Sequence, residues 1–282
     1  MGVDDERRPT VAPDGLAQLG LGPHQAREYP QWTVAVAEST GIGVGPRPRR
    51  PLVFDLFHTL LDGADDERDR MIGEMAVEIE VPPGALVAAY HASWRERLVG
   101  WGVEETIRIL ARRLGHDPTD AQVSRAATLR RAFARRTLDT ATDATLTVLD
   151  RLRADGHRLA LLSNATAESA AAWAGSRLAP RFDVAVFSCE VGLAKPDPAI
   201  YRHTAARLGV APAVCVFIGD GSDGELAGAE AAGMTPLRTT EHKDTDPSWR
   251  GPVIGGLGDL PALLGRADVG RAAGTPLGSG GR

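Results

Sequence analysis

Residues 51–61 read PLVFDLFHTLL, and this stretch decides how the rest of the chain is interpreted. The apolar run at its start is typical of a buried strand in a parallel sheet. Asp55 follows that run directly, and the hydroxyl of Thr59 comes four residues later. Open α/β sheets bind ligands beyond the carboxyl ends of their strands, so Asp55 is a candidate nucleophile with solvent in front of it.

From residue 140 onward, helical and strand-like segments alternate. Near-continuous apolar strands that alternate with helices indicate a parallel sheet covered on both faces. The predicted fold class is therefore α/β, a doubly wound parallel sheet with right-handed crossovers and a Rossmann-like core. We expect strands at 158–162, 184–187, 214–218 and 236–238, and helices at 145–154, 166–174, 198–208, 223–232 and 257–264.

The segment between the first strand and residue 140 is different, because its apolar residues recur only at helical spacing. Thr119 and Gln122 have the spacing of a capping box at the start of its last helix. An all-helical insert must pack on a small core of its own. We expect a catalytic core of residues 51–62 and 140–265, a helical lobe of residues 63–139, a disordered extension of residues 1–50 and a flexible tail of residues 266–282.

Composition excludes several classes of protein. The chain has 282 residues, of which 43% are hydrophobic and 24% charged, as in a globular protein with a sizeable core. A formal net charge of −5 argues against a nucleic-acid partner. The sequence has no apolar run long enough to span a bilayer, so we expect a cytoplasmic protein. We expect it to be a monomer or homodimer. Cys189 and Cys215 are interpreted as small buried hydrophobes rather than a disulfide or a metal pair.

Further polar groups follow later strands. Ser163 and Asn164 come after the predicted strand 158–162, Lys195 lies in a loop, and Asp220 follows the predicted strand 214–218. Taken singly, each has an ordinary structural interpretation, such as a helix cap or a solvated lysine. Together with Asp55, four sites in this order resemble the haloacid dehalogenase-like hydrolase superfamily over about residues 51–265.

This resemblance implies a covalent hydrolytic mechanism and a helical cap that closes over the active site. Asp55 would be the nucleophile, and Lys195 would lie beside it and keep its carboxylate ionised. Thr59 and Ser163, with Asn164 next to it, would complete the catalytic set by binding the oxygens of the substrate.

The loop GDGSDGE at residues 219–225 indicates a metal site. Carboxylate oxygens are hard ligands that suit Mg²⁺, and the proposed ligands are Asp55, Asp220, Glu225 and the backbone carbonyl of Phe57. Glu225 stands where the family usually has a second acidic residue, and Asp223 competes for that role. For both of these, the first turn of a helix favoured by the macrodipole is an equally good explanation.

Phe57 departs from the phosphatases of the superfamily. They have a second aspartate at this place, which protonates the leaving group, and a phenylalanine side chain cannot do so. His58 is a candidate substitute because its pKa ordinarily lies near neutrality, although a histidine that packs under the cap is the alternative.

Other residues resemble the 2-haloacid dehalogenases, in which the leaving halide needs no proton. An aromatic residue at position 57, the pair Trp94-Arg95 and Tyr201 all match that group, and Arg95 would contact the halide. Asp220 does not match, because those dehalogenases have a neutral serine there. We favour Mg²⁺-dependent hydrolysis of a small phosphorylated metabolite; a metal-free dehalogenase and a non-catalytic binding or regulatory relative stay open.

Overall fold

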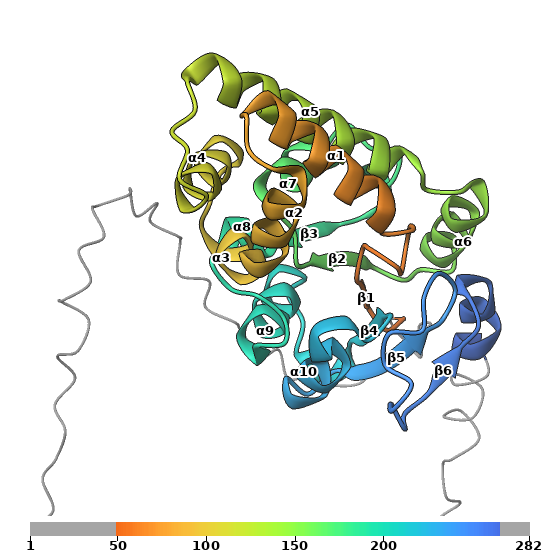
Figure 1. Ribbon diagram of the computed structural model, residues 1–282. Coiled ribbons are helices and arrows are strands. Elements are labelled where there is room, and N and C mark those ends of the chain that lie inside the picture. Colours follow the sequence, from red (N-terminus) through yellow and green to blue (C-terminus); the bar gives the residue numbers. More distant parts are fainter. Residues whose placement is uncertain (1–48, 266–282) are drawn as a thin grey trace, which may run out of the picture. The chain divides into compact units, whose positions relative to one another are not determined.

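The computed structural model describes residues 49–265, so the expectations for an N-terminal extension and a C-terminal tail lie outside the described residues. Its centre is a sheet of six parallel strands in the order β3-β2-β1-β4-β5-β6 (Figure 1). The predicted doubly wound α/β fold is confirmed. The strands are β1 (Leu52–Phe54), β2 (Leu159–Ser163), β3 (Val184–Phe187), β4 (Val216–Gly219), β5 (Thr235–Thr239) and β6 (Val253–Ile254).

β1 is central because both of its faces are apolar. Leu52 pairs in parallel with Leu159 of β2 on one side and with Val216 of β4 on the other. Leu52 and Phe54 point into the cluster on one face of the sheet, and Val53 points into the cluster on the other. All three are 0% exposed, so the strand delivers Asp55 to the sheet edge on a rigid support.

Helices cover both faces of the sheet. On the face of Leu52 lie α6 (Asp143–Ala154), α7 (Ala167–Trp173) and the C-terminal helical residues 260–265, which follow the 3₁₀ turn η4 (Leu257–Asp259). On the face of Val53 lie α9 (Pro198–Arg207) and α10 (Glu225–Ala231). Short helical segments make up the remaining connections: η1 (Ala179–Arg181), α8 (Ser188–Val191) and η2 (Pro212–Val214).

Several elements differ from the prediction: α8 was not predicted, and the strand expected at 214–218 begins only at Val216. β6 was not predicted, because two residues are too few to show a period. The helix expected from residue 223 instead begins at Glu225, after the 3₁₀ turn η3 (Ser222–Gly224). Asp223 has a left-handed backbone with φ of 55°, and Gly224 follows with φ of 72°, so a regular helix cannot start before them.

The helical lobe comprises five helices with their own apolar core, to which Ile72, Leu110 and Phe133 belong. α1 packs along the length of α5 (Figure 1), and α5 also contacts α7 of the core. Thr119 caps α5 as expected, since its hydroxyl accepts from the Gln122 amide at 3.3 Å. Among residues 49–265, no helix has both the length and the apolar composition needed to cross a membrane. The helices are α1 (Asp65–Glu78), α2 (Pro83–Ala92), α3 (Trp94–Val99), α4 (Val103–Arg113) and α5 (Asp120–Asp139).

Both cysteines are free thiols. Cys215 is fully buried next to β4, whereas Cys189 in α8 is only partly buried. Burial raises the pKa of Cys189 to about 12 and that of Cys215 to about 11. Neither sulfur is therefore a thiolate nucleophile at neutral pH.

Candidate active site

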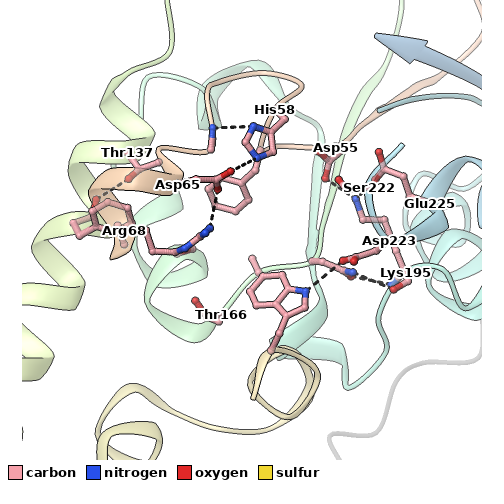
Figure 2. A pocket seen from close by; sticks show the side chains of 18 of the residues that line it. Asp55, His58, Asp65, Arg68, Thr137, Thr166, Lys195, Ser222, Asp223 and Glu225 are labelled. Atoms are coloured by element: carbon pink, nitrogen blue, oxygen red, sulfur yellow. Dashed lines mark hydrogen bonds and ion pairs between the residues drawn. The ribbon is translucent and has the colours of Figure 1, made fainter. Parts of the chain in front are cut away.

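A cavity of about 190 Å³ lies at the carboxyl ends of the strands, between the core and the helical lobe. Figure 2 shows Asp55, Lys195 and Glu225 on its core side, with Asp65 and Arg68 of α1 on the opposite side. The predicted gathering of strand-end residues is thus observed for Asp55, Asn164, Lys195 and Glu225, which all line this cavity.

Asp55 and Lys195 form a buried ion pair in the cavity wall. Lys195 Nζ donates to Asp55 Oδ1 at 2.5 Å and also contacts the carboxylate of Glu225. Burial disfavours an ammonium ion, but these two carboxylates outweigh burial and hold the pKa of Lys195 well above its usual range. Lys195 is therefore a permanent cation next to the candidate nucleophile.

Asn164 and Tyr201 hold Lys195 and Glu225 in position through hydrogen bonds. The Asn164 amide donates to the Lys195 carbonyl at 3.0 Å and accepts from the Lys195 amide at 2.8 Å. Tyr201 is fully buried, and its hydroxyl donates to the Glu225 carbonyl at 2.7 Å. Tyr201 does not line the cavity.

The carboxylates of Asp55, Asp220 and Glu225 offer ligand atoms within 4.8 Å of one another. Asp220 is 0% exposed, and its Oδ2 has no hydrogen-bond partner among the described residues. Burial raises the pKa of Asp55 and of Glu225; Lys195 opposes this, and Asp220 adds to it. Three carboxylates and one ammonium leave an excess of negative charge, which a divalent cation would offset, so the donor set fits Mg²⁺.

The geometry separates the two acidic candidates of the loop. Glu225 lies in the carboxylate cluster, but both of its oxygens already accept, from the Gly221 amide at 3.0 Å and from Lys195. Asp223 lies outside the cluster, and its Oδ2 accepts from Trp94 Nε1 of the lobe at 3.3 Å. Of the three acidic residues in this loop, Asp220 is the one whose side chain has a buried oxygen without a hydrogen-bond partner among the described residues.

Two hydroxyls at the strand ends are also unpartnered. Thr59 and Ser163 are 0% exposed, and within residues 49–265 neither Oγ has a hydrogen-bond partner. Neither residue is among those that line the cavity. Buried hydroxyls usually have a hydrogen-bond partner, so these two are candidate donors to a bound ligand.

Phe57 and His58 both line the cavity. The imidazole Nδ1 of His58 accepts from the Gly63 amide at 3.3 Å, and Nε2 lies 3.5 Å from Asp65 Oδ2 (Figure 2). The proton of a neutral ring is thus expected on Nε2, directed at Asp65. A Cβ at position 63 would lie 2.2 Å from the His58 ring, so a larger residue there would displace the imidazole.

The lobe wall contains residues that sequence patterns did not indicate, above all Arg68 and Arg130. One signal was present: Arg130 lies on the buried stripe of α5, between Ala127 and Phe133, where an unpaired charge would be unfavourable. Arg95 is exposed and does not line this cavity; it borders a neighbouring one of about 200 Å³ together with Trp94 and Lys195.

Residues 52–233 match the family model described as haloacid dehalogenase-like hydrolase. The chain belongs to this family. Two relatives of the hydrolase are a glyceraldehyde 3-phosphate phosphatase from Methanopyrus kandleri, 42% identical over 65 residues, and a phosphoserine phosphatase from Thermus thermophilus, 36% identical over 87 residues. The matches span 23% and 30% of this chain, and only 28% and 35% of the length of the relatives.

Solved structures share the fold of this hydrolase across both kinds of chemistry. A HAD phosphatase from Thermococcus onnurineus has a TM-score of 0.58 and 19% identity, and the match covers 77% of this chain and 98% of that one. A 2-haloacid dehalogenase from Pseudomonas syringae has a TM-score of 0.58 and 23% identity, with coverage of 78% and 99%. At these identities the likeness establishes the fold alone.

Proposed function

We propose that this hydrolase removes phosphate from a small phosphorylated metabolite, with Asp55 as nucleophile and Mg²⁺ as cofactor. The observation that carries the proposal is the contact of Lys195 Nζ with Asp55 at 2.5 Å beside Asp220, whose Oδ2 is buried without a partner. The phosphatase names of the two relatives support it.

The reaction has two displacements at phosphorus. The Asp55 carboxylate attacks the phosphorus atom, the ester P–O bond breaks, and the alcohol leaves after it takes up a proton. Water then attacks the phosphorus of the aspartyl phosphate, which releases inorganic phosphate and restores the carboxylate. Lys195 offsets the negative charge that accumulates during both displacements, and Thr59 and Ser163 are proposed as donors to the phosphoryl oxygens.

Asp55, Asp220 and the carbonyl of Phe57 would hold the metal, with Glu225 beside them. Bound Mg²⁺ would supply Lewis-acid stabilisation of the phosphoryl oxygens. Glu225 already accepts from Gly221 and Lys195, so its contribution is to fix Lys195 and to add negative charge.

The leaving group needs a proton, and no residue of this site is well placed to donate it. Phe57 cannot supply it, and both ring nitrogens of His58 face other groups, Gly63 and Asp65. We therefore expect the rate to depend steeply on the pKa of the leaving group, so that aryl and acyl phosphates react faster than alkyl phosphates. Phe57→Asp should flatten that dependence. A plot of log kcat/KM against leaving-group pKa for both proteins measures it; a slope near zero in the wild type would show that His58 or another residue already donates the proton.

A metal-free dehalogenase is the second candidate, and the observation that favours it is Phe57 in the cavity wall, where the acid would be. In that reaction Asp55 attacks the halogen-bearing carbon, halide leaves without a proton, and water hydrolyses the ester. Arg95 borders the cavity next to the active site rather than the active site itself.

One panel separates the candidates. Phosphate esters, phosphonates and 2-haloacids are assayed with Mg²⁺ and with EDTA, and release of phosphate and halide is measured. We expect phosphate release only, and its loss in EDTA. Halide release that survives EDTA would replace the phosphatase by the dehalogenase, and no turnover of any compound would favour a non-catalytic relative.

A further inference from the structure

A second cavity, of about 250 Å³, lies inside the helical lobe beside the active site. Three side chains, Arg68, Trp94 and Arg130, line both this cavity and that of Asp55. The other residues that line it are Tyr90, His91 and Arg97, so within the described part of the chain the wall has three arginines and no carboxylate.

Arg97 is the most unusual of these residues. It is 3% exposed, and it has no carboxylate within ion-pair distance among residues 49–265. Its guanidinium stacks on the Tyr90 ring at 3.7 Å and donates to the Tyr90 carbonyl at 2.9 Å, but Nη1 is buried without an acceptor. Burial lowers the pKa of Arg97, and the positive charge of Arg130 lowers it further, although Tyr90 opposes this.

Arg130 approaches the same tyrosine ring from α5. Its guanidinium carbon is 5.5 Å from the Tyr90 centroid, and Nε lies 2.5 Å from Glu168 Oε1 of α7. Nη2 reaches the Thr166 hydroxyl at 3.4 Å, whereas Nη1 is buried without an acceptor. Glu168 therefore pairs with Arg130 alone, and within the described residues each of the two guanidinium groups keeps a desolvated N–H group that lacks a partner.

A guanidinium N–H without a partner is unfavourable in a protein interior, and a planar anion is the group that satisfies it best. We propose that this cavity is an anion subsite, which binds a second negatively charged group, carboxylate or phosphate, at the far end of the substrate. The substrate would extend from Asp55 past Trp94 to Arg97 and Arg130. This inference rests on the proposed function, and it narrows the substrate class to phosphate esters with a distal anion.

A matched pair of substrates tests the subsite on the wild type. 4-(Carboxymethyl)phenyl phosphate and 4-(carbamoylmethyl)phenyl phosphate have nearly the same size and, because a methylene separates the distal group from the ring, nearly the same leaving-group pKa; they differ in the charge of the distal group. We expect kcat/KM to be higher for the carboxylate by about ten-fold or more, as a charged pair of hydrogen bonds provides. Equal values, or a preference for the amide, would overturn the inference.

Substitutions of Arg97 then test whether this side chain causes the preference for the carboxylate. In Arg97→Lys the charge stays but the two-pronged donor is lost, and in Arg97→Met both are lost, so the carboxylate-to-amide ratio should fall stepwise towards one. Arg113→Lys is the matched control, because Arg113 also lies over an aromatic ring, Trp101 at 4.9 Å, but is half exposed and outside the cavity. A ratio unchanged in both Arg97 variants, each shown by circular dichroism to be folded, would exclude Arg97 from the subsite and contradict the proposal.

The test also separates this inference from the proposed function. If Asp55→Asn leaves hydrolysis of both aryl phosphates intact, the nucleophile assignment fails. If hydrolysis depends on Asp55 but the distal carboxylate gives no advantage, the subsite alone fails. A series of inhibitors measures how far the subsite lies from Asp55. Among ω-carboxyalkylphosphonates of increasing length, the one that reaches Arg97 should bind most tightly. The corresponding alkylphosphonates, which lack the carboxylate, should show no such optimum.

Discussion

The enzyme contains two buried clusters of charged side chains. One has more carboxylates than cations, and the other has more guanidinium groups than carboxylates. In the acidic cluster, Asp55, Asp220 and Glu225 surround a single cation, Lys195. In the arginine cluster the single anion, Glu168, pairs with Arg130, and no carboxylate of the described residues lies within ion-pair distance of Arg97. All seven side chains are at least nine-tenths buried, so water does not screen either excess.

The difference indicates what each end of the cavity is built to receive. A fully paired cluster would be a structural feature, and it would need nothing more. An excess of carboxylate with a free oxygen on Asp220 favours a cation, whereas an excess of guanidinium with free N–H groups favours an anion. A substrate with a phosphoryl group near the metal and an anionic tail satisfies both ends at once.

The largest expected effect comes from removing the nucleophile of the acidic cluster. Asp55→Asn should lower kcat by roughly 10⁴–10⁶-fold with an unchanged fold, because an amide of the same shape cannot attack phosphorus. Asp62→Asn is the control, since Asp62 is 75% exposed a few residues away in the same loop. Single-turnover kinetics of the two folded proteins measure the effect; substantial residual turnover by Asp55→Asn would remove Asp55 from its role.

The next effect concerns the arginine cluster and stability. Glu168→Gln removes the counter-ion of the buried Arg130 guanidinium and should lower the free energy of unfolding by about 3–5 kcal/mol. The control is Glu104→Gln, which breaks the exposed pair between Glu104 of α4 and Arg131 of α5 and should change the free energy of unfolding by less than about 1 kcal/mol. Urea denaturation of both variants decides it. Equal effects would mean that the two pairs do not differ in the way their burial implies.

Metal binding gives a smaller effect, at the acidic cluster. Mg²⁺ at about 100 times its Kd should stabilise the native protein by about 2.7 kcal/mol. For a chain of this size that is a rise in Tm of about 5–10 °C. Asp220→Asn should abolish the rise, and Asp223→Asn in the same loop should keep it, because Asp223 contacts Trp94 instead. Differential scanning calorimetry with Mg²⁺ and with EDTA tests this; a rise that persists in Asp220→Asn would mean that the ion binds elsewhere.

The smallest effect is the pH dependence of the Arg130–Glu168 pair. Burial alone would raise the pKa of Glu168, but Arg130 outweighs it and the pKa lies below its usual range. The unfolded chain therefore takes up the proton first as pH falls, so this stabilisation is complete at neutral pH and is lost below about pH 4.5. The difference in unfolding free energy between wild type and Glu168→Gln should shrink as pH falls from 7 to 3. A constant difference over that range would show that Glu168 is not stabilised as the anion.

The sequence was sufficient to predict strands β1 to β5 and the residues of the site that follow them, but not the edge strand β6. Asp55, Ser163 and Asp220 each come at or just after the end of a short apolar run. Because the carboxyl ends of parallel strands lie at the same edge of the sheet, this pattern predicts that the three residues lie close together. Lys195 needed the resemblance to a family, since a loop lysine has no pattern of its own. The boundaries between core, lobe and terminal segments stay predictions.

The lobe side of the site was not predictable for a physical reason. A helix shows which of its faces is apolar, but not which neighbour that face meets, so Arg97 and Arg130 could not be assigned to a cavity. Arg95 was selected for its place next to Trp94, yet the helix turns it to solvent and buries Arg97 two residues later. Tyr201, likewise selected by resemblance, lies beneath Glu225 rather than in the cavity.

The central position of β1 also has a consequence for biosynthesis. The strand that carries Asp55 is made first, but the lysine that pairs with it comes 140 residues later, and the neighbouring strand β4 later still. Contacts this distant in sequence form slowly, whereas the helices that pack together in the lobe, from α1 to α5, all lie within residues 65–139. On the ribosome all of the lobe is therefore made while Asp55 still lacks its counter-ion, and we expect a truncated chain that ends before Lys195 to show no hydrolysis.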